Sequence, residues 1–304
     1  MNHSQVISVI VCCYNPDFEK LKKTLLSIER QDYPHFEVII SDDGSKTSYE
    51  NELKKWVDDN GWNNVIYNFL PANVGTVKSI LSACHIAKGE YVKTISPGDF
   101  LFDEHSLSNY MDAFLNHSAD FVYGKFVYFD LNGNIVRNVS PRFRSTFNPD
   151  KLKRNLVIFG DMILGAVVAF KRQLVIDYLS DIGNSVRLLE DAPLEILSVI
   201  NNNHIVFVDK PLVWYECGSG VSTNPNSIKL IDDEFSSLYQ YLFENYGTNK
   251  YIMKAKRYRR YNGMKIKKTL LFPLYVFLRI KSCFCKPYFY KKIKNINEVA
   301  FLKG

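Results

Sequence analysis

The chain has 304 residues, of which 46% are hydrophobic and 23% charged, a composition typical of folded globular proteins that excludes disordered and fibrous classes. Its net charge of +6 is unevenly placed, because residues 250–304 hold 16 of the 38 Lys and Arg residues but only one acid, Glu298. Residues 1–249 carry 31 acids against 22 bases, so a body of charge −9 precedes a tail of +15, which argues against nucleic-acid binding by the body.

Neither a membrane span nor a secretory signal is expected. The longest apolar run, Leu270 to Leu278, contains Pro273 and is far shorter than the roughly 20 residues that cross a bilayer. The first residues have no basic region and no small-residue cleavage site. The six cysteines form no CxxC pair and show no zinc-type spacing to histidine. These features predict a cytoplasmic protein with reduced thiols.

Strands alternate with helices over the first hundred residues. Residues 6–14 form a near-continuous β-branched run, as expected for a strand buried on both faces, and residues 18–28 place apolar side chains at helical spacing. The same pattern predicts strands at 36–41, 65–70 and 90–95, with helices at 48–59 and 75–88. This order predicts a parallel, doubly wound α/β sheet with helices on both faces.

The pattern loosens beyond Asp103. A hairpin is predicted that turns at Asn132 and Gly133. The other expected elements are a helix at 107–116, an apolar strand or buried element at 162–170, a helix at 188–200, closing strands at 205–208 and 213–215, and a polar loop at 218–224. The sequence contains no internal repeat and no low-complexity linker.

Polar residues follow each of the first four predicted strands. In open parallel sheets, ligands bind at the carboxyl ends of the strands, so this clustering predicts a ligand site. The residues are Tyr14 and Asn15 after the first strand, Asp42 and Asp43 after the second, Asn73 after the third and Asp99 after the fourth.

Three of these residues have a second interpretation. Asp99 is a candidate oxygen ligand for a divalent cation, or it caps the following helix. Asp43 is placed to accept hydrogen bonds from a base such as uracil, whereas Asp42 either contacts the ligand or only stabilises the turn at Gly44. Tyr14 lies against the base or is a core aromatic at a strand end.

The adjacent acids Glu190 and Asp191 are candidates for a general base. Neighbouring residues on a helix point about 100° apart, so at most one of them should enter the site. The alternative is a pair of first-turn acids favoured by the helix dipole. Motifs for other chemistries, HExxH, GxSxG and GxxxxGK[ST], do not occur.

Four stretches together resemble a family 2 glycosyltransferase of the bacterial polysaccharide type, over residues 6 to about 222. They are SVIVCCYNPDFEKLKKTLLSIERQDYPHFEVIISDDGS, NVGTVKSI, KGEYVKTISPGDFL and LLEDAPLE. The resemblance implies a GT-A fold, Rossmann-like with a mostly parallel central sheet flanked by helices. It also implies a nucleotide-sugar donor, often a UDP-sugar, a divalent metal (Mn or Mg) and inversion at the anomeric carbon.

The resemblance assigns roles residue by residue. The donor-binding residues would be Tyr14 and Asn15, Asp42 and Asp43, Gly75 of the NVG loop, and Lys78 as a phosphate contact, with Asp99 on the metal and Asp191 as the catalytic base. The chain departs from the family pattern where Ser96 and Gly98 replace common carboxylates of the metal motif. One carboxylate with diphosphate oxygens and water still completes an octahedral site.

The basic tail suggests a membrane surface. Residues 250–294 contain 15 Lys and Arg and no acid, interleaved with aromatics around the apolar LLFPLYVFL. This fits an interfacial segment on anionic lipids, with solvated or oligomer-forming helices and nucleic-acid binding as weaker alternatives. We therefore expect a catalytic domain at 1–225 and a basic, helical, membrane-associating region at 226–304, peripheral on the inner face of the cell membrane.

The expected function is transfer of a sugar to a glycan or a polyprenyl-diphosphate-linked acceptor in cell-surface polysaccharide synthesis, such as capsule. Two other functions stay open. A nucleotidyltransferase would normally show a glycine-rich basic loop after the first strand, where this chain has CCYNPDFEK. A non-catalytic sugar-nucleotide-binding membrane scaffold is favoured only by the reduced metal motif.

Overall fold

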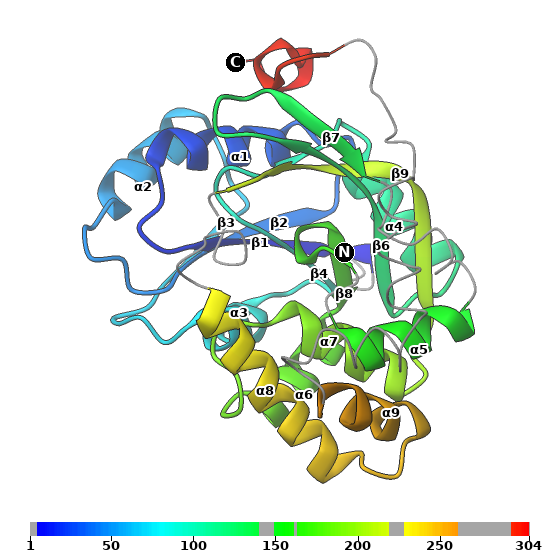
Figure 1. Cartoon of the computed structure of the whole chain (residues 1–304). Helices are drawn as coiled ribbons and strands as arrows, with labels where there is room; N and C mark the ends of the chain where they lie inside the picture. Colours follow the sequence, from blue (N-terminus) through cyan, green and yellow to red (C-terminus); the bar gives the residue numbers. More distant parts are fainter. Residues whose placement is uncertain (1–4, 140–148, 161–162, 219–227, 261–292, 304) are drawn as a thin grey trace.

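The computed structural model describes residues 5–139, 149–160, 163–218, 228–260 and 293–303 (Figure 1). Strands and helices alternate first as β1 (Ile7–Cys13), α1 (Phe18–Glu29), β2 (Phe36–Asp42), α2 (Glu50–Asp59), β3 (Val65–Phe69), α3 (Thr76–Ile86) and β4 (Tyr91–Ile95). These four strands are parallel, as the sequence predicted, and the structure places them in the order β3-β2-β1-β4. Cys13 lies beside Asp42 and Val11 beside Ile95, so the strand ends share one edge.

The sheet becomes mixed beyond β4. The elements are β5 (Phe100–Leu101), α4 (Ser106–Asn116), β6 (Phe121–Phe129), β7 (Ile135–Val139), α5 (Pro149–Phe159), β8 (Val168–Lys171), α6 (Arg172–Ile182), α7 (Asp191–Ile200) and β9 (Ile205–Glu216). Strand β8 joins β4 to β6 by antiparallel pairing, β9 runs parallel to β6, and β5 pairs with the end of β9. The hairpin of β6 and β7 is confirmed, whereas the apolar element predicted at 162–170 is a strand only from Val168.

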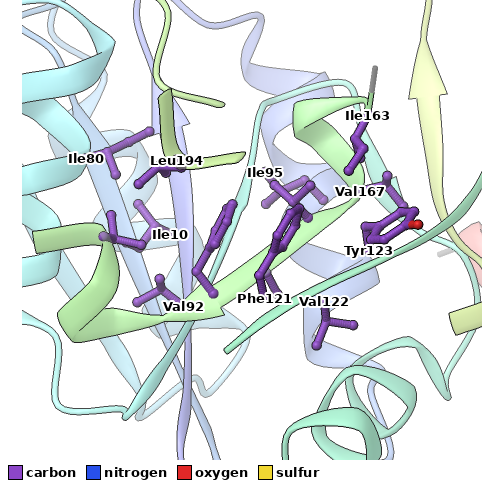
Figure 2. Packing of buried hydrophobic residues seen from close by; sticks show 14 of the residues in the cluster. Ile10, Ile80, Val92, Ile95, Phe121, Val122, Tyr123, Ile163, Val167 and Leu194 are labelled. Atoms are coloured by element: carbon purple, nitrogen blue, oxygen red, sulfur yellow. The ribbon is translucent and has the colours of Figure 1, made fainter. Parts of the chain in front are cut away.

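Helices cover both faces of the sheet. In Figure 1, α3, α6 and α7 lie on one face and α1 and α4 on the other. Figure 2 shows the packing on the first face, where Ile80 of α3 and Leu194 of α7 meet Ile10 and Val92 of the sheet. All four side chains are at most 4% exposed, and burial of each stabilises the fold by about 1.5–3 kcal/mol.

Two segments of the predicted basic region pack on the rest of the protein. Helices α8 (Ile228–Asn245) and α9 (Lys250–Arg259) form a further layer below α5 and α7, with Leu242 and Ile252 in the main core. Residues 293–303 lie against the β6–β7 hairpin on the opposite side, where Ile296 and Val299 pack in a second cluster with Phe129 and Trp214. A domain boundary near residue 225 stays a prediction.

Several predicted features lie outside the described residues. They are most of the basic stretch 250–294 with its LLFPLYVFL patch, and nearly all of the loop at 218–224. Among the helices that the structure describes, none is both long and apolar enough to cross a bilayer.

Candidate active site

Hydrogen bonds join the turn after β1 to the turn after β2. Asn15, with φ +45°, donates its backbone N–H to Ser45 Oγ at 2.7 Å and accepts from Lys46 N at 2.8 Å through Oδ1. Asp42, 3% exposed, accepts from Ser45 N at 2.7 Å, from Ser45 Oγ at 2.5 Å and from Tyr49 Oη at 2.8 Å. These are the hydrogen bonds of a turn-stabilising carboxylate, which was one of the two interpretations left open for Asp42.

The Asp43 carboxylate holds the loop at residues 73–75. It accepts from Val74 N at 2.7 Å, and from Gly75 N and Asn73 Nδ2 at 2.9 Å. These three donors leave Oδ1 with a single partner, so one acceptor position remains for a base or another ligand. Gly75 then begins α3, as its N-cap.

The other two predicted donor contacts are exposed. Tyr14 is 47% exposed at the end of β1, so the interpretation of Tyr14 as a core aromatic is wrong. Lys78 lies exposed in the first turn of α3, between the buried Val77 and Ser79. Both side chains are accessible to a ligand at this edge of the sheet.

Asp99 lies at the end of β4, where β5 and β9 bring a second acid. The pairing of Phe100 with Trp214 places Asp99 beside the last residue of β9, and Asp99 Oδ1 accepts from Glu216 N at 2.9 Å. The Glu216 carboxylate binds Lys20 Nζ of α1 at 2.7 and 2.8 Å. Asp99 does not cap α4, whose N-cap residue is His105, so that alternative is wrong.

Gly98 is required by this arrangement. It has φ +102°, and a Cβ there would lie 3.0 Å from Glu216 Oε2. A carboxylate of the family motif at position 98 would therefore occupy space that Glu216 fills from another strand. Glu216 and Lys20 also border a groove of about 470 Å³ that reaches Phe129 and Val299.

The buried side chains of Asp99 and Lys93 interact electrostatically. Burial raises the pKa of Asp99 to about 7, although the Glu216 N–H and the Lys93 charge oppose the shift. Lys93 of β4 is fully buried, and its Nζ donates to Ala166 O at 2.8 Å and to Thr94 O. Burial lowers the pKa of Lys93 to about 7, while the negative charge of Asp99 raises it.

The residues at Asp99 fit a divalent cation held together with a diphosphate. In the described parts of the chain, no three acidic, histidine or cysteine side chains gather into a metal cluster. Asp99 Oδ2 and the Glu216 carboxylate are the nearby acidic oxygens, and Lys20 already neutralises Glu216. Mg²⁺ commonly binds through one or two carboxylates plus phosphate oxygens and water, so this donor set suffices.

Glu190 and Asp191 both border one small cavity, together with Thr94 of β4 and Gly165. The expectation that at most one of the pair enters the ligand site stays a prediction. The volume of this cavity is about 10 Å³, room for about one water molecule. Asp191 Oδ1 accepts from Ala192 N at 2.7 Å, and a Cβ on Gly165 would lie 2.5 Å from Oδ2. Burial, followed by the Asp191 charge, raises the pKa of Glu190 well above its ordinary value.

Sequence reasoning missed four residues near this edge: Lys20, Lys93, Arg187 and Glu216. A lysine within the apolar YVKTI strand was the only available signal, because a strand buried on both faces leaves no exposed position for it. Lys20 and Glu216 are separated by 196 residues, and nothing in either local sequence indicates their contact.

Comparisons with known proteins show the family and the fold of the chain. Residues 8–179, more than half of the chain, match the sequence profile described as Glycosyl transferase family 2. The chain belongs to the family 2 glycosyltransferases, and it is a glycosyltransferase with the GT-A fold. An uncharacterised glycosyltransferase of Haemophilus influenzae is 26% identical over 135 residues, which are 44% of this chain and 52% of that protein.

Solved structures show the same fold. S. aureus TarS (residues 1–349) in complex with UDP-GlcNAc has a TM-score of 0.53 and 21% identity over 78% of this chain and 70% of that chain. The Pyrobaculum calidifontis mannosyltransferase PcManGT, in complex with GDP-Man and Mn²⁺, has a TM-score of 0.54 and 16% identity over 80% and 65%. The TarS structure with UDP is likewise matched over 65% of its length, and the chain spans about half of the curated relative.

Proposed function

We propose that this glycosyltransferase moves a sugar, with inversion, from a nucleotide-sugar to an acceptor hydroxyl in cell-surface polysaccharide synthesis. The observation that carries the proposal is the placement of Asp43 and Asp99 at the ends of β2 and β4, on either side of β1, with the Glu190–Asp191 pair facing β4. A UDP-sugar is the first donor to test, because TarS binds UDP and UDP-GlcNAc.

The nucleotide would bind at the ends of β1 and β2. Tyr14 offers an exposed aromatic face to the base, and Asp43 has an acceptor position left for a base N–H. Asn15 and Asp42 support this pocket through their bonds to the 45–49 turn. Lys78, exposed on the first turn of α3, lies where a phosphate benefits from the helix N-terminus.

Asp191 would be the catalytic base. A sugar hydroxyl is a poor nucleophile, so a carboxylate must take its proton as the oxygen attacks the anomeric carbon from the face opposite the nucleotide. That direction of attack inverts the centre. Burial, followed by the Asp191 charge, raises the pKa of Glu190 and favours its protonated form.

Asp99, with Glu216 beside it, would hold a Mn²⁺ or Mg²⁺ ion that neutralises charge on the departing nucleoside diphosphate. Asp99 must be ionised to do so, which its interaction with Lys93 favours. Lys20 and Lys78 add positive charge near the leaving group.

The acceptor would be a glycan or a polyprenyl-diphosphate-linked sugar at the inner face of the cell membrane. Helix α9 supports this part of the proposal, because its exposed side chains include Lys254, Lys256 and Arg257 while Ile252 and Ala255 are buried. Basic residues attract anionic lipids by about 1 kcal/mol each near the surface. The double variant Lys254→Glu with Arg257→Glu should reduce sedimentation with phosphatidylglycerol vesicles, and unchanged sedimentation would contradict membrane binding through α9.

The decisive experiment is nucleotide release from a panel of UDP-, GDP- and dTDP-sugars with Mn²⁺, Mg²⁺ or EDTA. We expect slow, metal-dependent release from one donor, and its loss in Asp99→Ala. Turnover of no donor, together with no thermal stabilisation by any of them, would contradict the proposal. Thermal stabilisation without turnover, even when a lipid-linked acceptor is supplied, would favour the scaffold instead. Pyrophosphate release from a nucleoside triphosphate and a sugar phosphate would indicate a nucleotidyltransferase.

A further inference from the structure

The loop between α6 and α7, at residues 183–190, is fixed at Arg187 from two sides. The Glu234 carboxylate of α8 accepts from three successive backbone N–H groups, those of Arg187 at 2.8 and 3.1 Å, Leu188 at 2.9 Å and Leu189 at 3.2 Å. From the other side, Val77 N of α3 donates to Arg187 O at 3.1 Å. The backbone of Arg187 is therefore held between α3 and α8.

The Arg187 side chain lies across the loop that Asp43 holds. Its guanidinium donates through Nη2 to Asn73 O at 3.2 Å and to Asn73 Oδ1. Asn73 in turn donates to Asp43. Gly75 makes this approach possible, because a Cβ at that position would lie 2.3 Å from Arg187 Cγ and 2.6 Å from Arg187 O.

The guanidinium is an exposed cation beside Asn73 of this loop. Within the described parts of the chain, Arg187 forms no ion pair with a carboxylate, and only Nη2 of its guanidinium donates to protein acceptors. An arginine has five N–H donors in a planar fork that matches a phosphate, so most of them remain for a ligand. The exposed Lys78 lies one turn into the neighbouring helix α3.

We propose that Arg187 binds the diphosphate of the donor and that Glu234 positions it, an inference that rests on the proposed function. Glu234 is a positioning residue, since its carboxylate contacts backbone N–H groups and not the ligand. Through it, helix α8, which follows the region matched by the family profile, becomes part of the donor site.

The test measures binding of UDP and of uridine by isothermal titration calorimetry, in the full chain with Mg²⁺. Arg187→Ala should weaken UDP binding by about 10-fold or more, as expected for loss of a charge-assisted contact, and leave uridine binding unchanged. Arg187→Lys should weaken UDP binding by less, because it keeps the charge. Equal UDP binding by wild type and Arg187→Ala would overturn the inference and leave the proposed function standing.

Other outcomes are equally decisive. Equal weakening of UDP and uridine would place Arg187 on the base and overturn the diphosphate contact. A wild-type protein that binds no nucleoside diphosphate, with GDP and dTDP also tried, would overturn the proposed function and this inference together.

Glu234 is tested by a double-mutant cycle. Glu234→Ala should weaken UDP binding several-fold in the wild type but add nothing in the Arg187→Ala background. The matched control is Asp233→Ala, an exposed acid on the same helix, which should leave UDP binding unchanged. Additive losses from Glu234→Ala and Arg187→Ala, in variants with unchanged circular dichroism, would show that Glu234 does not act through Arg187.

Discussion

The acids at the end of β2 and those at the end of β4 have opposite surroundings. Asp42 and Asp43 each accept three hydrogen bonds from nearby backbone and side-chain donors of the protein. Among the residues that the structure describes, Asp99 accepts one, from Glu216 N, and burial raises its pKa to about 7. Farther along the same edge, burial raises the pKa of Glu190.

The difference separates two tasks. A carboxylate with its partners already in place fixes the loops around it, because each lost bond leaves a buried donor unpaired at a cost of about 1–3 kcal/mol. A buried carboxylate with few partners is held in an unfavourable state that a cation or a proton relieves. We therefore propose that the β2 end builds the donor pocket and that the β4 end with α7 carries the chemistry.

The largest expected effect is a loss of turnover. Asp191→Asn should lower turnover by roughly 100-fold or more, because the amide cannot accept the acceptor's proton, while the Kd for the donor stays within about twofold of wild type. Nucleotide release in the presence of acceptor measures turnover, and calorimetry measures the Kd for the donor. Equal losses of turnover and donor affinity would assign Asp191 to the structure of the pocket.

The donor side is tested by Gly75→Ala. Gly75 has φ +93° and touches Arg187, so the new methyl group must push this side chain or the loop away, and UDP affinity should fall by about 10-fold. Gly61→Ala is the matched control, because Gly61 has φ +70° but no heavy atom within 4 Å of a Cβ. It should lose stability from backbone strain alone and keep its UDP affinity. A similar loss of affinity in both variants would contradict a local role of Gly75.

A smaller difference should separate the two acids of the β2 end. In Asp43→Asn, the amide N–H₂ must oppose a backbone N–H, either that of Val74 at Oδ1 or that of Gly75 at Oδ2, and neither can become an acceptor. The variant should therefore lose about 1–3 kcal/mol of stability and bind UDP several-fold more weakly. In Asp42→Asn, the hydroxyls of Ser45 and Tyr49 can rotate to accept from the amide. Chemical denaturation should therefore show the smaller loss for Asp42→Asn. The reverse order would contradict this account of the two turns.

The sequence predicts the parts of this fold that depend on neighbours in the chain. The β-branched runs of β1, β2 and β4 and the turn residues that end them are local signals, so the strand ends and Asp42, Asp43 and Asp99 could be predicted from them. The turn role of Asp42 was an open alternative for the same reason, since Ser45 is three residues away.

Contacts between distant segments could not be predicted in this way. Glu216 comes to Asp99 only because β5 pairs with the end of β9, and Glu234 comes to Arg187 only because α8 returns to the sheet edge. Neither pairing leaves a periodic signal in the sequence. The mixed half of the sheet is harder to predict from sequence for the same reason. Its strand β8 is only four residues long and inserts between β4 and β6.

The smallest effect concerns the buried Lys93, whose charge interacts with that of Asp99. Because the pKa of Lys93 is about 7 in the folded protein and near 10.5 when unfolded, the unfolded chain binds the additional proton between these values. The penalty for burying the charge is fully present below pH 7, and stability rises as the pH increases from about 7 to 10.5.

Lys93→Met lacks this group, so the Tm of the variant minus that of wild type should fall over this range. We expect a change of roughly 2 °C or more, the shift that about 1 kcal/mol gives a protein of this size, measured by calorimetry at pH 6.5 and 9.5. A difference that stays constant across this range would mean that Lys93 keeps its ordinary pKa, and that its bonds to Ala166 and Thr94 compensate for burial.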